Sequence, residues 1–320
     1  MLILSEKEIA QAASLLKAGK VIAFPTETVY GLGASIFQPD AIADIFRVKG
    51  RPQDNPLIAH ISHLDQVHQI AQEIPDLFYA LADIFFPGPL TIVLRKKAHV
   101  PSIVSAGLNS IALRMPSHPI AQQLIEWVGE PIVAPSANIS GKPSATCCQH
   151  VIDDFEGKIA AVIEGGKTYY GIESTVISLI DDIPVLLRPG AVSSVMIEQV
   201  IKRPVLYPSS NLESAPPPSP GMKYRHYAPK APVSLFKDLA QLLQGVGKDP
   251  NVPKMILSRE PPSCSLPASY HWFPLNASDF YARLRQADDA HYCEILICCD
   301  EQTLLDLALM NRILKASSCI

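Results

Sequence analysis

The amino-acid sequence predicts a mixed α/β protein in which a larger domain with one main sheet precedes a smaller α/β domain. Two observations predict this fold class. Short apolar runs alternate with amphipathic stretches along the chain, and a proline-rich segment interrupts that alternation after residue 203. The 320 residues, 48% of them hydrophobic, suffice for about two domains with sizeable cores.

The larger domain is expected to begin with a helix. Ser5 and Glu8 form a capping-box pattern, and the apolar residues that follow repeat at helical spacing as far as Gly19. Buried strands and helices then alternate, and the glycines at 31 and 33 read as a tight turn. The predicted strands are 21–24, 56–61, 91–94, 110–115, 132–134 and 175–180, and the predicted helices are 40–49, 65–74 and 118–128.

The smaller domain follows a linker. Residues 204–232 hold eight prolines, a composition that no packed helix or strand would carry. Beyond them, apolar runs typical of parallel strands alternate with helical stretches. The expected division is a domain at 1–203, a linker at 204–232 and a small α/β domain at 233–320, with strands at 233–236, 254–257 and 294–299 and helices at 238–246, 278–288 and 301–316.

Composition excludes several classes of protein. Acids exceed bases by four, and no run approaches about 18 apolar residues, so we expect a cytoplasmic protein without a membrane span. Seven cysteines without a C-x-x-C pair indicate neither a disulfide framework nor a zinc site. Ile36 stands where a dinucleotide-binding fingerprint needs glycine, and the Walker A, G-x-S-x-G and H-E-x-x-H signatures are missing.

Polar and cationic residues instead gather at the ends of predicted strands and helices. Strand alternation places Ser110 and Arg114 on one face, about 13 Å apart, so that a ligand could lie between them. Singly, such an arginine is usually a solvated charge and a serine loop is usually a turn. Together, and with a pI of about 6.1, they favour compact anions over a nucleic-acid backbone. A nucleoside triphosphate and a small carboxylate are the predicted ligands.

At this level of detail the chain resembles a known family. Eight ordered segments look like the threonylcarbamoyl-AMP synthase family with its YrdC-type domain, in the long form that carries a C-terminal extra domain. They are "PTETVYGLGA", "KGRPQDNPLIAHI", "FPGPLTIVL", "SIALRMPSHP", "APSANISGKPSAT", "GIESTVISL", "LLRPGAV" and "SPGMKYRHYAP". The resemblance implies a twisted mixed sheet with flanking helices and a concave active face, followed by a smaller Rossmann-like domain.

The same resemblance implies an activity. L-threonine, bicarbonate and ATP would give threonylcarbamoyl-AMP and pyrophosphate, which feed the modification of the tRNA adenosine beside the anticodon. Mg²⁺ would be carried by the ATP phosphates, without an organic cofactor or a metal site on the protein, and downstream threonylcarbamoyl-transfer proteins would be the partners.

The resemblance also assigns residues to ligands. Threonine would meet Thr28, His60, Arg114, Ala134 and Ser174. ATP would meet Lys49, Arg51, Asn55, Ser110, Ser136, Asn138, Ser144, Arg188 and Tyr227, of which Lys49, Arg51, Ser136 and Asn138 would carry catalysis by positioning and charge neutralisation. Tyr30 would be structural, and the glycines at 31 and 33 would let the following helix approach.

The sequence leaves two competing functions. An RNA-binding module is disfavoured by the acidic net charge and by the lack of aromatic stacking motifs, so we expect no stable nucleic-acid binding. A carbamoyl-transfer enzyme of hydrogenase maturation, which contains a related domain, would need paired C-x-x-C zinc fingers, and the sequence has none.

The linker is expected to fold over the concave face as a lid, with Tyr227 at the nucleotide phosphates.

Overall fold

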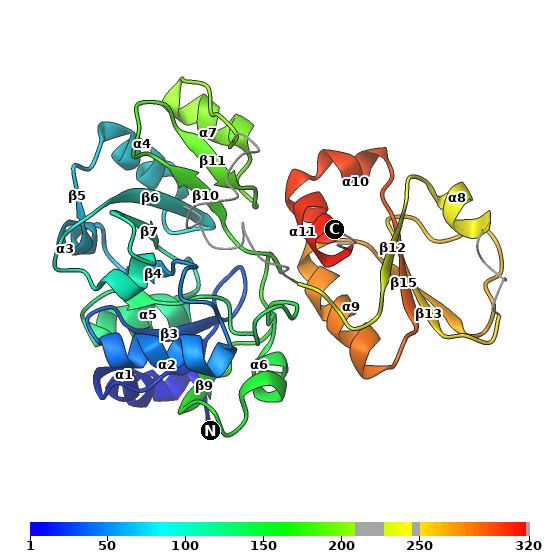
Figure 1. The fold of residues 1–320 in the computed structure, drawn as a ribbon, viewed down its shortest axis with the longest axis horizontal. Coiled ribbons are helices and arrows are strands. Elements are labelled where there is room, and N and C mark those ends of the chain that lie inside the picture. Colours follow the sequence, from blue (N-terminus) through cyan, green and yellow to red (C-terminus); the bar gives the residue numbers. More distant parts are fainter. Residues whose placement is uncertain (209–226, 245–249, 318–320) are drawn as a thin grey trace. The chain divides into compact units, whose positions relative to one another are not determined.

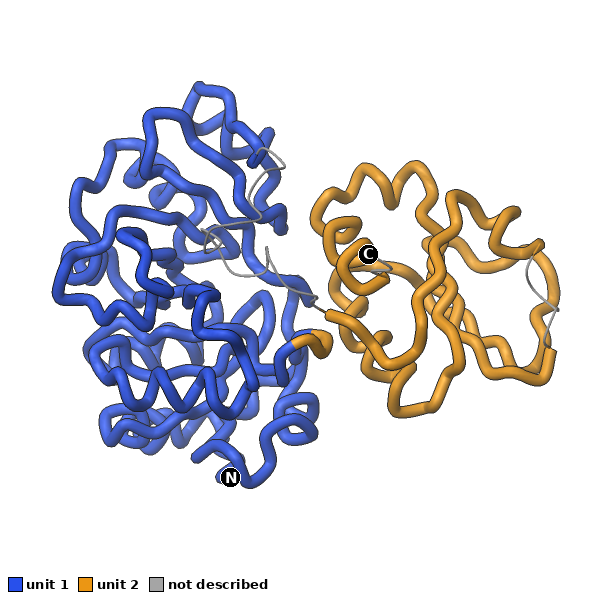
Figure 2. The backbone as a smooth tube through the Cα atoms, viewed as in Figure 1, with its two compact units in different colours: residues 1–140, 144–224 blue, residues 141–143, 225–320 orange. Residues whose placement is uncertain are grey.

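Two compact units make up the protein. The computed structural model describes residues 1–208, 227–244 and 250–317. One unit contains Met1–Ser140 and Ser144–Tyr224, and the other contains Gly141–Pro143 and Arg225–Ile320 (Figure 2). The three residues 141–143 therefore group with the second unit although the sequence around them belongs to the first.

The first unit is built on one large mixed sheet (Figure 1). In the described residues it has eleven strands in the order β1-β9-β2-β3-β8-β4-β7-β6-β10-β11, and β5 pairs with β6. The predicted mixed sheet is confirmed. The strands are β1 (Leu2–Leu4), β2 (Ile22–Phe24), β3 (Gly31–Ser35), β4 (Ile58–His60), β5 (Ala71–Gln72), β6 (Leu90–Lys96), β7 (Ser110–Arg114), β8 (Ile132–Val133), β9 (Ala161–Ile163), β10 (Thr175–Ser178) and β11 (Val185–Arg188).

Helices cover this sheet and supply the other half of its cores. The α-helices are α1 (Ile9–Lys17), α2 (Pro39–Lys49), α3 (Val67–Ile70), α4 (Asp76–Phe85), α5 (Pro119–Val128), α6 (Cys148–Phe155) and α7 (Ser194–Ile201), and the 3₁₀ turns are η1 (Glu6–Glu8), η2 (Leu64–Gln66) and η3 (Ser102–Ser105). The expected start of the first helix is confirmed, because the backbone N and Oγ of Ser5 both donate to Glu8 Oε2, at 2.8 and 2.7 Å. Helices α1 and α5 bury their apolar faces together in one core cluster.

The glycine-rich segment after β2 is a strand and not the expected turn. Gly31–Ser35 forms β3, which pairs antiparallel with both β2 and β8. A Cβ atom on Gly33 would lie 2.8 Å from the Phe24 ring and 2.9 Å from Ile132 Cγ2. The glycines therefore make room for side chains of the two neighbouring strands, and the following helix, α2, also lies against β3, as expected. Tyr30 is structural as expected, with its hydroxyl donating to Gly166 O and accepting from Gly165 N.

The helix predicted over 65–74 is much shorter than expected. Only η2 and the four-residue α3 are helical, and the chain then enters β5. Ala71 and Gln72 pair with Lys96 and Arg95 at the end of β6. Sheet pairing overrides the helical apolar spacing here, because it satisfies the backbone groups of a segment whose first residue is buried.

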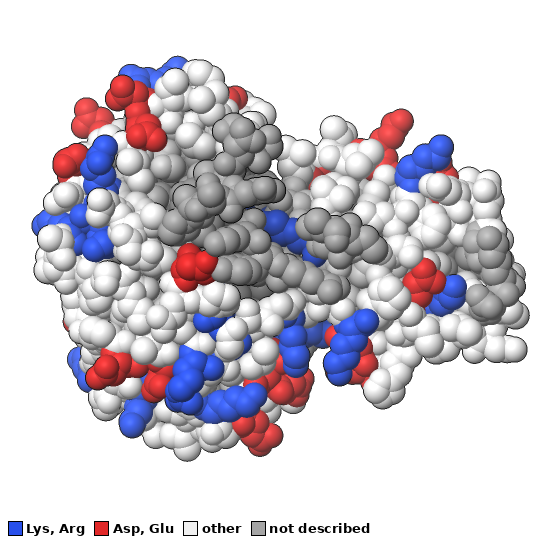
Figure 3. All heavy atoms as spheres, in the orientation of Figure 1, with Lys and Arg blue, Asp and Glu red and all other residues white. Residues whose placement is uncertain are grey.

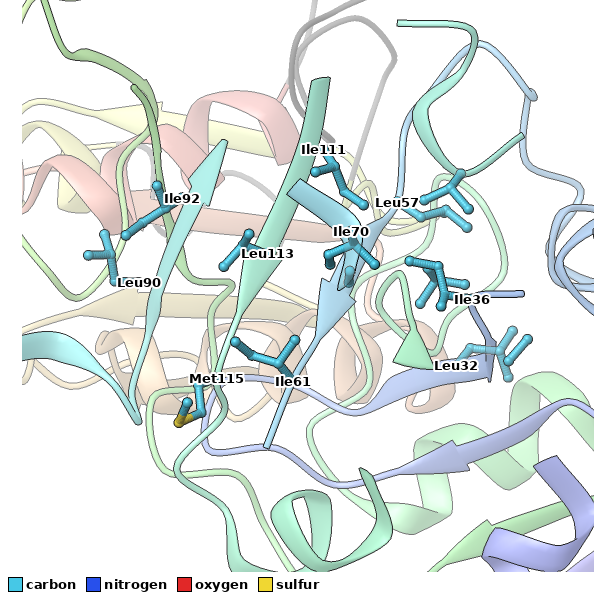
Figure 4. Close-up of a cluster of buried hydrophobic side chains, with 14 of the residues drawn as sticks. Leu32, Ile36, Leu57, Ile61, Ile70, Leu90, Ile92, Ile111, Leu113 and Met115 are labelled. Atoms are coloured by element: carbon cyan, nitrogen blue, oxygen red, sulfur yellow. The ribbon is translucent and has the colours of Figure 1, made fainter. Parts of the chain in front are cut away.

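Strand β7 separates a hydrophobic core from a polar face. Ile111, Leu113 and Met115 lie in the main core cluster (Figure 4). Ala112 packs in a different cluster with residues of β4, β6 and β10. The predicted alternation is confirmed, so Ser110 and Arg114 lie on the face away from that core.

The second unit contains a parallel sheet in the order β12-β15-β13-β14. Its strands are β12 (Val233–Phe236), β13 (Lys254–Ser258), β14 (Tyr270–Pro274) and β15 (Glu294–Cys298), and its helices are α8 (Leu239–Gln244), α9 (Ala277–Asp289), α10 (Glu301–Leu305) and α11 (Leu307–Ser317). Strand β14 was not predicted. The helix expected over 301–316 is two helices, because Asp306 leaves helical geometry and its side chain accepts a hydrogen bond from Leu309 N.

Several expectations concern residues that the structure does not describe. Residues 209–226 include most of the expected linker, so the lid lies outside the described residues, and the boundaries 1–203, 204–232 and 233–320 stay a prediction. The six described cysteines are free thiols. In the described ranges, no helix is long and apolar enough to cross a membrane, and no three His, Cys, Asp or Glu side chains gather as a metal site would require.

Candidate active site

Arg114, at the end of β7, is the centre of a buried polar cluster. Its Nε donates to Gly88 O at 3.1 Å, and its Nη1 donates to Thr28 Oγ1 at 2.8 Å. Its Nη2 forms a salt bridge with Glu27 Oε1 at 2.5 Å. The side chains of Arg114 and Glu27 are only 4% and 8% exposed. Glu27, Thr28, His60 and Arg114 are called the Arg114 cluster below.

Thr26 fixes the loop between β2 and β3, which carries Glu27 and Thr28. Thr26 Oγ1 donates to Val29 O at 2.6 Å and lies 2.9 Å from Thr28 Oγ1. It also accepts from the backbone N of Thr28 and Val29. Such hydroxyl-to-backbone contacts fix a turn, so the sequence around Thr26 fixes the backbone at Glu27 and Thr28.

His60 stands beside Arg114 on the neighbouring parallel strand, β4. Its Nδ1 lies 3.2 Å from Ile58 O, and its ring meets the edge of Phe24. Burial, helped by the Arg114 charge, lowers the pKa of His60 from 6.5 to about 3. The imidazole is therefore neutral at physiological pH and adds no second positive charge to the cluster.

Ser174 reaches the same region of the sheet from the start of β10. Its Oγ lies 2.7 Å from Thr91 Oγ1 on β6, the strand between β10 and β7. Arg188 holds Ser174 twice, through Nε to its carbonyl at 3.0 Å and through Nη2 to its hydroxyl at 3.2 Å. These side chains are buried, so Arg188, Ser174 and Thr91 form a connected hydrogen-bonded chain on this face of the sheet.

Lys49 fixes a second polar group, called the Lys49 cluster (Lys49, Ser136 and Asn138). The Lys49 ammonium donates to Ser136 O at 2.6 Å and to Asn138 O. Ser136 Oγ donates to Asn138 Oδ1 at 2.6 Å, and Ser140 N donates to Lys49 O at 2.8 Å. Gly50 ends α2 in the left-handed conformation, and this places the buried Lys49 against the loop after β8.

Known proteins resemble this chain over its whole length. A family model described as "Telomere recombination", which covers Sua5, YciO and YrdC proteins, matches residues 14–190. A model described as "Threonylcarbamoyl-AMP synthase, C-terminal domain" matches residues 192–318. The threonylcarbamoyl-AMP synthase of Bacillus subtilis is 42% identical over 98% of this chain and 94% of its own.

This chain belongs to the threonylcarbamoyl-AMP synthase family. The enzyme of that name from Pyrococcus abyssi is 51% identical over 72% of this chain and 68% of its own length. A crystal structure of Pyrococcus abyssi Sua5 complexed with L-threonine superposes with a TM-score of 0.91, at 42% identity, over 99% of this chain and 98% of that one.

The structure brings together most of the residues that the family resemblance assigned to threonine. Thr28, His60 and Arg114 form the Arg114 cluster, and Ser174 lies two strands away from β7 through Thr91. Ala134 N donates to Ile58 O at 2.9 Å, which ties the end of β8 to β4.

The residues expected at the nucleotide are more dispersed. Arg51 bonds the carbonyls of Asn55 and Pro56 at the end of its own loop. Ser144 Oγ donates to Glu173 Oε1 at 2.5 Å, and Ser110 is half-buried at the start of β7. Asn55 Oδ1 is buried and meets no donor within the described ranges. Tyr227 is in the second unit, where its ring lies 4.9 Å from that of Tyr281.

Three polar residues of this family member were not expected from the sequence. Glu27 pairs with Arg114, Thr91 with Ser174, and Glu173 with Ser144. Each lies inside one of the family-like segments. The partners are far apart in the sequence: 87 positions for Glu27 and Arg114, 83 for Thr91 and Ser174, and 29 for Glu173 and Ser144. A buried carboxylate or hydroxyl inside such a segment is the signal that could have marked them.

Proposed function

We propose that this chain makes L-threonylcarbamoyl-AMP and pyrophosphate from L-threonine, bicarbonate and ATP. The product would supply the N6-threonylcarbamoyl group of the tRNA adenosine beside the anticodon, through downstream threonylcarbamoyl-transfer proteins in the cytoplasm. The observation that carries the proposal is the likeness, over almost the whole chain, to a Sua5 structure with bound L-threonine, combined with a buried Arg114 cluster suited to a carboxylate.

The proposed reaction needs no protein nucleophile. The threonine ammonium loses a proton, the free amine attacks the bicarbonate carbon, and water leaves to give a carbamate. A carbamate oxygen then attacks the α-phosphate of ATP as pyrophosphate leaves. Arg114 and Thr28 hold the threonine carboxylate, with a fork of N–H groups that suits it. His60, Ala134 and Ser174 line the threonine position in this proposal.

Positioning and charge carry the rate at the nucleotide end. Lys49 fastens the loop that presents Ser136 and Asn138, which its two bonds to backbone carbonyls support, and Arg51 orders residues 55 and 56. The proposed nucleotide contacts are Lys49, Arg51, Asn55, Ser110, Ser136, Asn138, Ser144, Arg188 and Tyr227. Mg²⁺ enters with ATP and is held by its phosphates in this proposal.

One face of the first unit carries exposed charges of both signs (Figure 3). On the face shown in Figure 3, acidic and basic side chains of the first unit are interspersed outside the atoms drawn in grey. A protein that binds an RNA backbone usually presents a broad basic face, and this face does not.

The test is pyrophosphate release measured with the complete mixture and with threonine or bicarbonate omitted in turn. Release is expected to require both compounds. Arg114→Lys serves as the matched variant, because it keeps the charge and removes the planar fork, and it is expected to raise the threonine concentration needed. Release that continues at the same rate without threonine would contradict the proposed function.

A further inference from the structure

The salt bridge between Glu27 and Arg114 leaves one carboxylate oxygen without a partner. Oε1 of Glu27 accepts from Arg114, but no donor among the described residues lies within hydrogen-bond distance of Oε2. The oxygen is buried in a side chain that is 8% exposed. Leaving a buried charged acceptor without a hydrogen bond costs free energy. A ligand that donates a hydrogen bond to Oε2 would remove this cost.

The surroundings of this oxygen already contain the groups that recognise a carboxylate. A guanidinium has five N–H donors, and three of those on Arg114 donate to Gly88, Thr28 and Glu27. The remaining two can meet a ligand carboxylate. The unpartnered acceptor of Glu27 and these donors of Arg114 belong to two side chains in direct contact.

An α-amino acid carries a positive and a negative group close together, which complement the carboxylate of Glu27 and the guanidinium of Arg114. Its ammonium and carboxylate are separated by one carbon atom, so a site with an acceptor beside a guanidinium matches both ends at once. A substrate with a carboxylate alone would satisfy Arg114 but leave Glu27 Oε2 unpaired.

We propose that Glu27 Oε2 accepts a hydrogen bond from the α-ammonium of the substrate while Arg114 binds its carboxylate. Glu27 is then a specificity-determining residue, which selects α-amino acids over acids that lack the α-ammonium and fixes the nitrogen that reacts. This inference rests on the proposed function, since it takes threonine as the substrate.

The experiment compares two ligands in calorimetry, L-threonine and (R)-3-hydroxybutanoate, a hydroxy acid that has a hydrogen atom in place of the α-ammonium and therefore offers Glu27 Oε2 no donor at that position. In Glu27→Gln, the affinity for threonine is expected to fall by about ten- to a hundredfold. The affinity for the hydroxy acid is expected to stay the same or increase, because Arg114 loses a competing carboxylate. Equal losses for both ligands would show that Glu27 acts only through Arg114, and an unchanged threonine affinity would also overturn the proposal.

The controls separate this inference from the proposed function. Wild-type protein that fails to bind threonine contradicts the proposed function itself, whereas wild type that binds threonine makes the variant comparison valid. Glu126→Gln makes the same chemical change on the exposed side of α5 and is expected to leave both affinities unchanged. If Glu27→Gln does not fold, Glu27→Asp carries the comparison: the shortened carboxylate should weaken threonine binding selectively, and equal weakening of both ligands would contradict it.

Discussion

The Arg114 cluster and the Lys49 cluster each bury a cation, but they hold it in different ways. Arg114 is held mainly by side chains, Glu27 and Thr28. Lys49 is held by two backbone carbonyls of the loop after β8. Side chains can reorient around a ligand, whereas carbonyls are fixed by the fold. We therefore expect the first cluster to rearrange around its substrate, and the second to keep the loop that carries proposed nucleotide contacts in a fixed position.

The largest expected effect comes from breaking the Arg114 cluster. Arg114→Ala leaves the Glu27 carboxylate buried without its counter-charge, so the free energy of unfolding should fall by about 3–5 kcal/mol in chemical denaturation, and threonine binding should be lost. Arg95→Ala is the matched control, because Arg95 pairs with Glu73 at 3.1 Å between exposed side chains. It should cost less than about 1 kcal/mol, and similar losses in both variants would contradict the buried-pair interpretation.

Breaking the Lys49 cluster should have a smaller effect on stability. Lys49→Met removes the donor of two buried carbonyls, which should cost about 2–3 kcal/mol. Pyrophosphate release should fall more than threonine affinity, since the loop with Ser136 and Asn138 loses its support. Lys96→Met makes the same change where the ammonium donates to one carbonyl, Val100 O, and should cost less. A parallel loss of threonine affinity and activity in Lys49→Met would remove the functional distinction between the clusters.

His60 adds a pH dependence to the Arg114 cluster alone. Its pKa is about 3 in the folded protein and 6.5 ordinarily, so the unfolded chain binds a proton between these values that the folded protein does not. The contribution of His60 to the free energy of unfolding is therefore fully present above pH 6.5 and is lost as the pH falls toward 3. The loss from this group should reach about 2 kcal/mol near pH 5. In His60→Gln, denaturation curves measured at several pH values should lack this contribution to the loss of stability. The same pH profile in the variant and the wild type would refute the role of His60.

The smallest expected effect is within the Lys49 cluster. Ser136→Ala removes one hydrogen bond, from Ser136 Oγ to Asn138 Oδ1, and should lower the free energy of unfolding by about 1 kcal/mol. Ser140→Ala is a control in the same loop. A loss in Ser136→Ala no larger than in that control would show that the Asn138 contact adds nothing to stability.

The face of β7 that carries Arg114 was predictable because strand alternation is a local rule. Ser110, Ala112 and Arg114 alternate with three apolar residues, and the structure places the latter in the main core. The salt bridge to Glu27 was not predictable in this way. Its two residues are 87 positions apart, and nothing in the spacing of either segment says that they meet.

The elements that differ from expectation were decided by tertiary pairing. Gly31 and Gly33 have turn composition, yet two neighbouring strands take them into the sheet. Ala71 has helical apolar spacing with its predecessors, yet β6 takes it into a strand. In β14 the aromatic residues of "YHWF" are typical of a strand, although the segment was not predicted as one.

The alternation along β7 also limits how this protein can vary in length. Substitutions at a single position change either the core or the substrate face, because successive side chains point to opposite sides. A one-residue deletion within Ser110–Arg114 would exchange the two faces, turning an isoleucine or leucine toward the ligand and a guanidinium into the hydrocarbon interior. Insertions and deletions among homologues should therefore be confined to the loops on either side of this strand, while its interior keeps a constant length.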